Sequence, residues 1–581
     1  MIQTRTPFLG LPLLSSGEIA TLEAEAIKQL GIPENCLMES AGRCAAQVLF
    51  DLSARGQMHL ASACVLVVCG SGGNGGDGAV VARYLHNRGV RCELWITAEN
   101  SRIRPDSLIQ LNSAAACGVP IHRSSAEHQT LRARLSGLGS QDVIVDALYG
   151  TGVSSKLAQT AAQLVEAING SSAFVLSLDV PSGLDANFGH PKGSEKAPAI
   201  VSADATVTFA FPKIGMSTSP GYLYVGDLFV ADIGIPETLL YKHENKDLLA
   251  TSRVLLPLGR SRQPLSHKGD NGHLLIVAGS PGKTGAALLC TEAALGVGIG
   301  LCTVALPEGC DAAPLGTRCP EAMTLGYPND PQAAATLLLQ EARRKKRALL
   351  LGPGLAPNDV SGALVACLVE QCPEPMVLDA EALNLLADHH DLLRQRIVGT
   401  TVLTPHPGEA ARLLKCSVQD IQNDRTQAAR QLAQSTQSIV VLKGARSVVA
   451  RPAQGVSSVV VIPTGNATMG SGGMGDVLAG MIGALLCTGQ AASVSAVAAS
   501  FWHGVAGDRL AQKRPAGVLL KATELIAELD AAKRQTLDDA HEESPWPVRR
   551  LSLSPGLRWR GQGLEETHPV FPMPTDAQPR R

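Results

Sequence analysis

The glycine-rich segment at residues 463–480, PTGNATMGSGGMGDVLAG, carries the strongest chemical signal in the chain. Backbone N–H groups at the start of a helix stabilise negative charge where a phosphoryl group arrives or leaves. An aspartate on that first turn, here Asp476, can accept the proton of a substrate hydroxyl. A helix cap with close-packing glycines is the structural alternative, but four glycines in six residues exceed what a cap needs. The pattern predicts phosphoryl chemistry with Asp476 as the catalytic base.

A second group of candidate residues lies in the N-terminal half, in three Gly/Asp loops that each follow an apolar run. The loops are GSGGNGGDG (70–78), the segment from Asp146 through the Gly/Thr loop at 150–156, and DVPSGLDA (179–186). Each carboxylate alone fits a helix cap as well as a ligand contact. Ligands of open parallel sheets bind outside the carboxyl ends of the strands, so three such loops predict one common site. The first loop does not match the GxGxxG dinucleotide fingerprint.

The elements that must position these loops read as two successive α/β domains. Short apolar runs separated by amphipathic stretches favour parallel sheets covered on both faces. A helix is expected at about 16–30, because Ser16 can cap it and Gly31-Ile32-Pro33 ends it. Strands are expected at 63–70, 92–97, 142–148, 173–180 and 205–211, and then at 273–280, 301–306, 347–354, 375–380, 401–407, 438–444, 447–451 and 457–463.

The domain limits follow from changes in composition along the 581 residues. A polar stretch around 241–258 is expected to link a domain at 10–243 to a second domain at 250–533. Beyond that the chain becomes rich in Pro, Arg, Glu and Ser, so residues 534–581 are expected to form a disordered tail. Small-residue helices near 485–510 are candidates for a contact in a homo-oligomer.

Composition restricts the class of partner. Fifty basic and 52 acidic residues give a net charge of −2, which provides no electrostatic footprint for nucleic acid or anionic membrane. Small-molecule substrates are therefore expected. The 14 cysteines include no CxxC pair, which favours reduced thiols in the cytoplasm. Neither a signal peptide nor a membrane span is expected.

Five N-terminal motifs occur in the order of a known family: LMESAGR (37–43), GNGGDG (73–78), DALYGTGV (146–153), LDVPSGLDA (178–186) and ADATVTFAFPKIG (203–215). They resemble the NAD(P)H-hydrate epimerase domain over about residues 10–240. The resemblance implies a Rossmann-like three-layer sandwich that interconverts the R and S hydrates of NADH and NADPH.

The same resemblance implies the residues of the epimerase site. Asp179 is the expected proton-transfer base, since epimerisation can proceed by ring opening and reclosure assisted by an acid/base group. Gly73 stands where the family usually has a second asparagine. The substrate contacts implied are Gly73, Asn74, Gly75, Gly76, Asp77, Gly150, Thr151, Gly152, Val153, Ser154, Ser155, Lys156 and Asp179. The potassium ligands implied are Asn74, Asp146 and Ser182, whose hard oxygen donors suit a weakly bound monovalent cation.

The C-terminal motifs resemble the ribokinase-like superfamily, and within it the ADP- or ATP-dependent NAD(P)H-hydrate dehydratases. Around the GxGD segment the motifs are 267–289, GPGLA (352–356), LDAEALNLL (378–386), TPHPGEAARLL (404–414), NDR (423–425) and VVLKGARSVV (440–449), covering about 260–530. The hydrate contacts implied are Ala287, Gly354, His406 and Asp476. The adenine-nucleotide contacts implied are Lys443, Gly444, Ala445, Arg446, Ser447 and Gly475.

The expected reaction activates the substrate hydroxyl by phosphorylation and then eliminates phosphate, with Mg²⁺ and the glycine N–H groups holding the phosphoryl group. A fusion of both domains looks bacterial, which favours ADP as the co-substrate. GKTG at 282–285 is not a P-loop, because the pattern needs glycine where Val277 stands. Two alternatives remain open at this stage: a ribokinase-like small-molecule kinase fused to a nucleotide-binding module, and an N-terminal domain that only binds.

Overall fold

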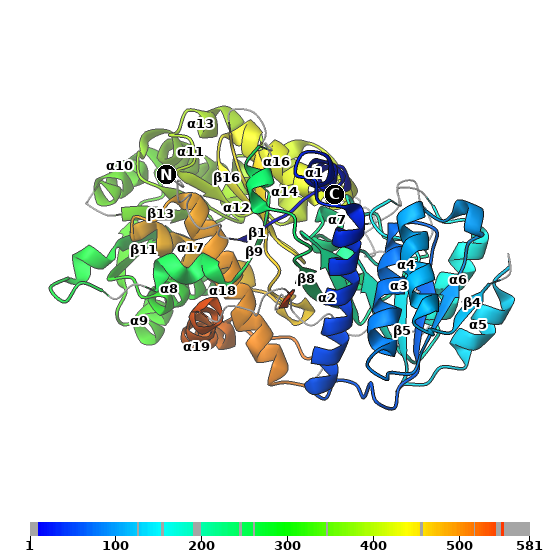
Figure 1. Ribbon diagram of the computed structural model, residues 1–581. Helices are drawn as coiled ribbons and strands as arrows, with labels where there is room; N and C mark the ends of the chain where they lie inside the picture. The colour runs from blue at the N-terminus through cyan, green and yellow to red at the C-terminus, as the bar shows by residue number, and fades with distance from the viewer. Residues whose placement is uncertain are drawn as a thin grey trace, which may run out of the picture.

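The computed structural model places the chain in two α/β units, each built on one sheet (Figure 1). It describes residues 10–124, 127–152, 156–189, 199–242, 247–259, 262–343, 347–453, 457–515, 517–541 and 548–550. Within this part of the chain, no helix has both the length and the apolar character needed to cross a membrane.

The smaller sheet has the order β19-β8-β7-β6-β5-β2-β3-β4 and is parallel except for β19. Its strands are β2 Val65–Cys69, β3 Cys92–Ile96, β4 Ile121–Arg123, β5 Val143–Ala147, β6 Phe174–Leu178, β7 Ala205–Phe209, β8 Asp227–Ala231 and β19 Val548–Arg550. Apolar side chains fill separate cores on the two faces, which makes this unit a three-layer sandwich.

Helices cover both faces of the smaller sheet. The core on one face includes residues of α1–α4, and the core on the other includes residues of α5 and α6. Their bounds are α1 Ser16–Lys28, α2 Glu34–Ala54, α3 Gly73–His86, α4 Pro105–Ala116, α5 Gln129–Ser136 and α6 Gln159–Asn169, and the short α7 spans Ile214–Ser217. This arrangement leaves the carboxyl ends of β2, β5 and β6 free to carry loops.

The larger sheet has the order β1-β9-β18-β17-β16-β15-β14-β13-β10-β11-β12. Its strands run parallel from β12 to β16, and β17 and β18 then form antiparallel pairs. The bounds are β1 Gly10–Pro12, β9 Leu248–Ala250, β10 His273–Val277, β11 Leu301–Pro307, β12 Met323–Tyr327, β13 Arg347–Leu351, β14 Met376–Leu378, β15 Thr401–Leu403, β16 Ile439–Leu442, β17 Val448–Arg451 and β18 Ser458–Val461.

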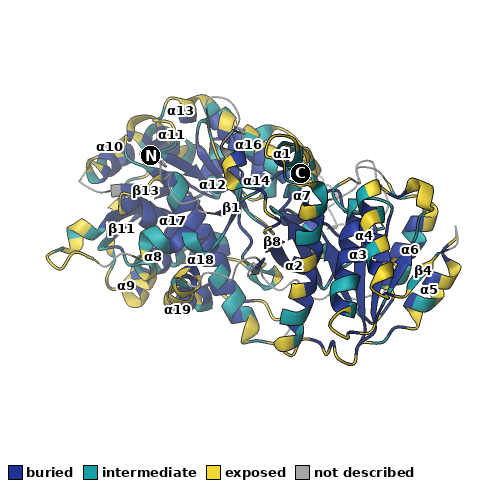
Figure 2. Cartoon of the chain, viewed as in Figure 1, coloured by how far each residue is buried: buried dark blue, intermediate teal, exposed yellow. Residues whose placement is uncertain are grey.

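Two helical layers bury the larger sheet, as the dark interior in Figure 2 shows. One face carries α8 Thr284–Val297, α17 Met474–Cys487, α18 Ala492–Gln512 and α19 Ala522–His541; the other carries α10 Pro331–Ala342, α11 Asp359–Gln371, α14 Pro407–Leu414 and α16 Arg425–Thr436. The shorter helices are α9 Ala313–Arg318, α12 Glu381–Leu385, α13 His390–Arg394 and α15 Val418–Asn423. A Cβ on Gly480 would lie 2.3 Å from the Cys290 carbonyl oxygen, so α17 approaches α8 at backbone distance.

The predicted fold class is confirmed. Each strand range expected from the sequence contains a strand, and the helix expected at 16–30 is α1. The fully apolar runs lie in the interior of the two sheets, where both faces are covered, which is why their composition identified them.

The first described residues correct the expected N-terminal domain limit. Gly10–Pro12 forms β1, which pairs antiparallel with β9 in the second sheet. The expected linker is itself ordered in part, because 248–250 forms β9 and Ser252–Leu258 forms the 3-10 helix η4. Strand β1 covers the unpaired edge that β9 would otherwise expose. The two units therefore share the larger sheet.

The expected disordered tail is wrong for part of its length. Helix α19 continues to His541, and Thr536 is only 1% exposed, with Leu537 packed on the large core. Residues 548–550 then pair with β8 of the smaller sheet. Composition suggested a solvated tail, but an amphipathic pattern within it buries one face of the helix. The remainder of 534–581 lies outside the described residues.

Candidate functional site

Three loops meet at the carboxyl edge of the smaller sheet, as the sequence predicted. Asn74 lies in the first turn of α3 and donates through Nδ2 to the Leu178 carbonyl oxygen at 3.1 Å. The Thr151 N–H is 3.4 Å from Oδ2 of Asp179, and a Cβ on Gly150 would be 3.0 Å from the same oxygen. Asp179 therefore lies between the loops that follow β2, β5 and β6.

Asp179 pairs with a lysine that the sequence analysis did not select. Lys213 Nζ lies 2.5 Å from Asp179 Oδ1 and also donates to Thr208 Oγ1 at 2.8 Å and to the Phe209 carbonyl oxygen at 3.0 Å. The Lys213 side chain is fully buried, whereas Asp179 keeps 14% of its side chain exposed. Asp179 also has φ 64°, a strained conformation for a non-glycine residue that is typical of functional sites. The Asp179 carboxylate is therefore partly exposed to solvent, while the Lys213 ammonium that neutralises it is buried.

Two further carboxylates surround this pair. Burial, followed by the charges of Asp179 and Glu23, raises the pKa of Asp77 well above its ordinary value. Burial and Asp179 also raise the pKa of Glu23 on α1, against the opposing effect of Lys213. Two carboxyl groups with raised pKa values therefore lie close to Asp179, which suits acid–base chemistry.

The oxygen atoms of the expected potassium ligands differ in how many hydrogen bonds they make within the protein. Asp146 is fully buried and accepts from Ser182 Oγ at 2.6 Å, from Ser182 N at 2.9 Å and from Ser177 Oγ at 2.9 Å. Burial nevertheless raises the pKa of Asp146. Asn74 Oδ1 is buried and has no hydrogen-bond partner among the described residues. Asp146 and Ser182 are thus hydrogen-bonded to each other, whereas the Asn74 Oδ1 atom is available to bind a ligand.

The first glycine loop is constrained unequally. A Cβ on Gly75 would lie 2.2 Å from the Gly70 carbonyl oxygen, and one on Gly76 would lie 2.4 Å from Met38 Sδ. At Gly73 the nearest atom would be an Arg104 guanidinium nitrogen at 3.6 Å. Backbone packing thus requires glycine at Gly75, a Cβ on Gly76 would displace the Met38 side chain, and Gly73 has room for a side chain.

Other expected contacts of the loop after β5 have no further support. Gly152 would meet no atom within 4 Å of an added Cβ, and Lys156 is exposed. Val153, Ser154 and Ser155 lie outside the described residues.

In the larger unit, Asp476 stands on the first turn of α17 beside a buried ion pair. Lys443 Nζ lies 2.7 Å from Asp379 Oδ1, and a Cβ on Gly475 would be 3.3 Å from that nitrogen. Burial and the charge of Asp379 raise the pKa of Asp476 to about 6, although Lys443 opposes the shift. Thr404 Oγ1 donates to Asp379 at 2.7 Å and fixes its orientation. The half-buried Asp476 is thus poised to accept a proton near neutral pH.

His406 caps α14 at the same edge. Its Nδ1 accepts from the backbone N–H groups of Gly408 at 3.0 Å and Glu409 at 3.3 Å, while the backbone N–H of His406 donates to Glu409 Oε2 at 2.8 Å. Burial and Lys443 lower the pKa of His406. Burial raises the pKa of Glu409 to about 7. This places a neutral imidazole and a second titratable carboxyl next to Lys443.

The remaining expected hydrate contacts line the loop after β10. Gly354 has φ 69°, and a Cβ there would lie 2.7 Å from the Lys283 carbonyl oxygen. Ser280 Oγ donates to the Gly354 carbonyl oxygen at 2.8 Å. Ala287 is fully buried on α8, 3.6 Å from where a Cβ on Gly279 would be. These small residues bring the loops after β10 and β13 together.

The expected nucleotide contacts form the turn between β16 and β17. Gly444 has φ 140°, and Arg446 has φ 55° although it is not glycine. Arg425 Nη2 donates to the carbonyl oxygens of Leu442 and Lys443, both at 3.1 Å. Ser447 Oγ donates to the Gly444 carbonyl oxygen at 3.0 Å. A buried guanidinium therefore holds one end of the turn.

Four residues at the two sites were not predicted individually from the sequence: Lys213, Glu23, Asp379 and Arg425. Asp379 follows β14 as Asp179 follows β6, so the strand-end argument already applied to it. Lys213 is the one charge in the apolar segment ATVTFAFPKIG, which is itself a signal for a paired buried cation. Glu23 had no such signal, because only the packing of α1 brings it to Asp179.

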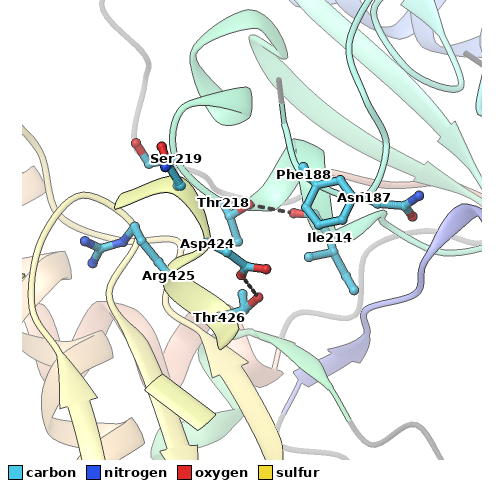
Figure 3. A pocket seen from close by; sticks show the side chains of 9 residues that line it. Asn187, Phe188, Ile214, Thr218, Ser219, Asp424, Arg425 and Thr426 are labelled. Atoms are coloured by element: carbon cyan, nitrogen blue, oxygen red, sulfur yellow. Dashed lines mark hydrogen bonds between the residues drawn. The ribbon is translucent and has the colours of Figure 1, made fainter. Parts of the chain in front are cut away.

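A crevice that is partly open to solvent lies between the two units (Figure 3). Asn187, Phe188, Ile214, Thr218 and Ser219 line it from the N-terminal side, and Asn423, Asp424, Arg425 and Thr426 line it from the C-terminal side. It includes none of the expected substrate contacts.

Comparison with known proteins covers both units. The family profile described as NAD(P)H-hydrate dehydratase matches residues 274–530, and the profile described as YjeF-related protein N-terminus matches residues 34–215. The chain is 38% identical over 507 residues to the bifunctional NAD(P)H-hydrate repair enzyme of Moorella thermoacetica, covering 86% of this chain and 93% of that protein.

A second curated relative and one solved structure also match the chain. The chain is 36% identical over 523 residues to the enzyme of the same description from Escherichia coli, covering 90% of this chain and 94% of that one. A crystal structure of the ADP/ATP-dependent NAD(P)H-hydrate dehydratase from Bacillus subtilis matches with 30% identity and a TM-score of 0.40, covering 48% of this chain and 94% of that one.

Proposed function

The chain belongs to the family of bifunctional NAD(P)H-hydrate repair enzymes, and from that premise we propose that it restores hydrated NADH and NADPH. The N-terminal unit interconverts the R and S hydrates. The C-terminal unit dehydrates the S form while ADP becomes AMP and phosphate. The observation that carries this proposal is Asp476 on the first turn of α17, beside the Lys443–Asp379 ion pair.

For epimerisation we propose Asp179 as the acid/base group that transfers the proton when the ring opens and recloses at the hydrated carbon. The Lys213 ammonium at 2.5 Å stabilises the carboxylate after it gives up a proton. The raised pKa of Asp77 supports a neutral carboxyl nearby as a hydrogen-bond donor to the substrate. The loops at 73–77 and 150–156 are proposed to hold the phosphates and sugar.

We propose that Asn74, Asp146 and Ser182 hold a potassium ion. Their donors are all oxygens, and the unpartnered buried Oδ1 of Asn74 supports a ligand at that atom. Bound there, the cation would supply positive charge for the polar groups of the substrate. Replacing Asn74 by leucine should remove any difference in epimerase rate between potassium and sodium buffers, and an unchanged difference would reject Asn74 as a ligand.

For dehydration we propose that Asp476 takes the proton of the ring hydroxyl. The hydroxyl oxygen then attacks the terminal phosphorus of ADP. AMP leaves, and the phosphorylated ring then loses phosphate from the hydrated carbon and a proton from the neighbouring ring carbon, which recovers the conjugated dihydropyridine. The N–H groups at the start of α17 and the Lys443 ammonium stabilise the transferring group. Ala287, Gly354 and His406 are proposed to position the hydrated ring.

We propose that Mg²⁺ arrives with the nucleotide. No group of three or more His, Cys, Asp or Glu side chains suitable for a metal exists within the described ranges. Mg²⁺ is ordinarily bound by one or two carboxylates together with substrate phosphates, so the Asp379 carboxylate is a sufficient protein donor and Asp476 stays available as the base. The ion would neutralise charge on the transferring phosphoryl group.

The deciding experiment incubates the purified chain with ADP, Mg²⁺ and either pure S hydrate or mixed epimers. Recovery is followed at roughly 340 nm, where dihydronicotinamides absorb. Complete recovery of the mixed epimers supports both activities, and recovery of the S form alone supports only dehydration. A stable phosphorylated product without recovery would instead identify a ribokinase-like kinase.

A further inference from the structure

One aromatic side chain of the N-terminal unit reaches the proposed nucleotide turn of the C-terminal unit. Tyr222 lies in the 3-10 helix η2, Gly221–Tyr224. The Arg446 guanidinium carbon is 4.6 Å from the centre of the Tyr222 ring. This is the geometry of a cation–π contact, and it joins two residues 224 positions apart.

Arg446 depends on such contacts to keep its conformation. Its φ of 55° is disfavoured for a side chain with a Cβ, so its surroundings must hold it there. The guanidinium donates to the Pro463 carbonyl oxygen, and the residue is only 7% exposed. Within the described residues it makes no ion pair with a carboxylate. The tyrosine ring and one carbonyl group are therefore its principal supports.

The electrostatic environment makes the ring contact stronger. Burial lowers the pKa of Arg446 to about 10, with Tyr222 and Asp508 opposing the shift. A cation removed from water gains more from an aromatic face than an exposed one does. Losing the ring would leave a buried charge with reduced compensation.

Arg425 supports the opposite end of the same turn. It donates to the carbonyl oxygens of Leu442 and Lys443, and a Cβ on Gly444 would lie 2.9 Å from its Nη2. Arg425 also lines the crevice between the units (Figure 3). The turn is thus held from within its own unit at one end and from the neighbouring unit at the other.

We propose that Tyr222 is a positioning residue of the dehydratase reaction: its ring on Arg446 holds the turn at 443–447 in the conformation that receives the phosphates of ADP. The inference rests on the proposed assignment of that turn to the nucleotide. Its consequence is that the N-terminal unit contributes to nucleotide affinity in the C-terminal unit.

The test measures steady-state kinetics of Tyr222→Ala in the full chain. The KM for ADP should rise about fivefold to thirtyfold, the range of a desolvated cation–π contact. The kcat of dehydration and the rate of epimerisation should stay within about twofold. Tyr222→Phe keeps the ring and should restore the ADP KM. The matched control is Leu223→Ala in the same 3-10 helix η2, where the side chain is 51% exposed and no change is expected.

A double-mutant cycle separates positioning through Arg446 from a general packing role. Arg446→Gly removes the side chain on which Tyr222 acts, so adding Tyr222→Ala should raise the ADP KM no further. The proposal would be overturned if the increases in ADP KM of the two single variants multiplied in the double variant. An unchanged ADP KM in Tyr222→Ala would also overturn it. Parallel loss of epimerase activity, or a Phe variant as defective as Ala, would also overturn it. If the unmodified chain shows no ADP-dependent recovery, the proposed function itself fails.

Discussion

Both candidate sites place a lysine against an aspartate at the carboxyl edge of a parallel sheet, but the lysines pair with different carboxylates. In the smaller unit Lys213 pairs at 2.5 Å with Asp179, the proposed base itself. In the larger unit Lys443 pairs at 2.7 Å with Asp379, and the proposed base Asp476 forms no ion pair within the described residues. The proposed base Asp179 is thus paired with a lysine, whereas the proposed base Asp476 is not.

The difference teaches what each reaction requires. Lys443 is proposed to face the nucleotide, and Asp379 favours its charged form. Burial alone would lower the pKa of Lys443, but the charges of Asp379 and Glu409 raise it. Asp476 instead feels burial and the negative charge of Asp379, which raise its pKa to about 6. A base with that pKa is ionised at neutral pH and still basic enough to take a proton from a hydroxyl.

The largest expected effect comes from removing the unpaired base. Asp476→Asn keeps the shape of the side chain but cannot accept a proton, so ADP-dependent dehydration of the S hydrate should fall about a thousandfold. Epimerisation, followed by separating the R and S forms, should be unchanged because Asp179 lies in the other unit. Loss of both activities would show that the two sites are not independent.

Removing the paired base should have the next largest effect. Asp179→Ala should slow interconversion of the R and S hydrates at least about a hundredfold, while dehydration of pure S hydrate continues. The measurement is the rate at which added R hydrate becomes available for dehydration. If the variant still interconverts the epimers at the normal rate, Asp179 is not the base.

Removing Lys213 tests whether the ion pair with Asp179 is needed for epimerisation. Lys213→Met replaces the buried ammonium by an apolar chain of similar length and leaves Asp179 without its counter-charge. Epimerisation should fall about tenfold to a hundredfold, with thermal stability reduced because a buried pair has lost one partner. Thermal unfolding recorded with the kinetics separates the two causes: a rate that falls only near the lowered midpoint would mean that Lys213 is structural.

How much of this could be predicted from the sequence differs between fold and site. The apolar strands were predictable because a doubly covered parallel sheet leaves near-continuous apolar runs. Strand β1 was not, because three residues paired to a distant edge carry no periodicity of their own. Helix α19 was underestimated beyond Lys533 because its buried face is made partly of small and polar residues such as Thr536 and Ala540.

Within the sites, residues that follow strands were predictable and their partners were not. Asp146 stands at the end of β5, Asp179 directly follows β6, and Asp476 follows Gly475 on the first turn of α17. Glu23 reaches the epimerase site from a helix more than 150 residues earlier than Asp179, and only tertiary packing reveals this. The contact of Tyr222 with Arg446 depends on the placement of two units and left no local pattern.

A pH profile sharpens the comparison between the two bases. Asp476 must be ionised to accept a proton, so kcat/KM for dehydration should fall about tenfold per unit as pH drops below about 6. Lys443 lowers the pKa of Asp476, so Lys443→Met should move this acid limb to higher pH in addition to weakening activity. A limb that stays in place in the variant would mean that another group controls it.

The smallest expected effect concerns the one position of the first glycine loop where a side chain fits. A Cβ at Gly73 would have only the Arg104 guanidinium as a neighbour, at 3.6 Å, so Gly73→Asn should keep epimerase activity within about a factor of two. Gly75→Ala is the contrasting variant, because its Cβ would meet the Gly70 carbonyl oxygen at 2.2 Å and displace the loop. It should lose about 1–3 kcal/mol of stability together with most epimerase activity, while dehydration of the S hydrate persists below the unfolding temperature. Equal behaviour of the two variants would mean that backbone packing does not govern this loop, and the site would then depend on the side chains of Asn74 and Asp77 alone.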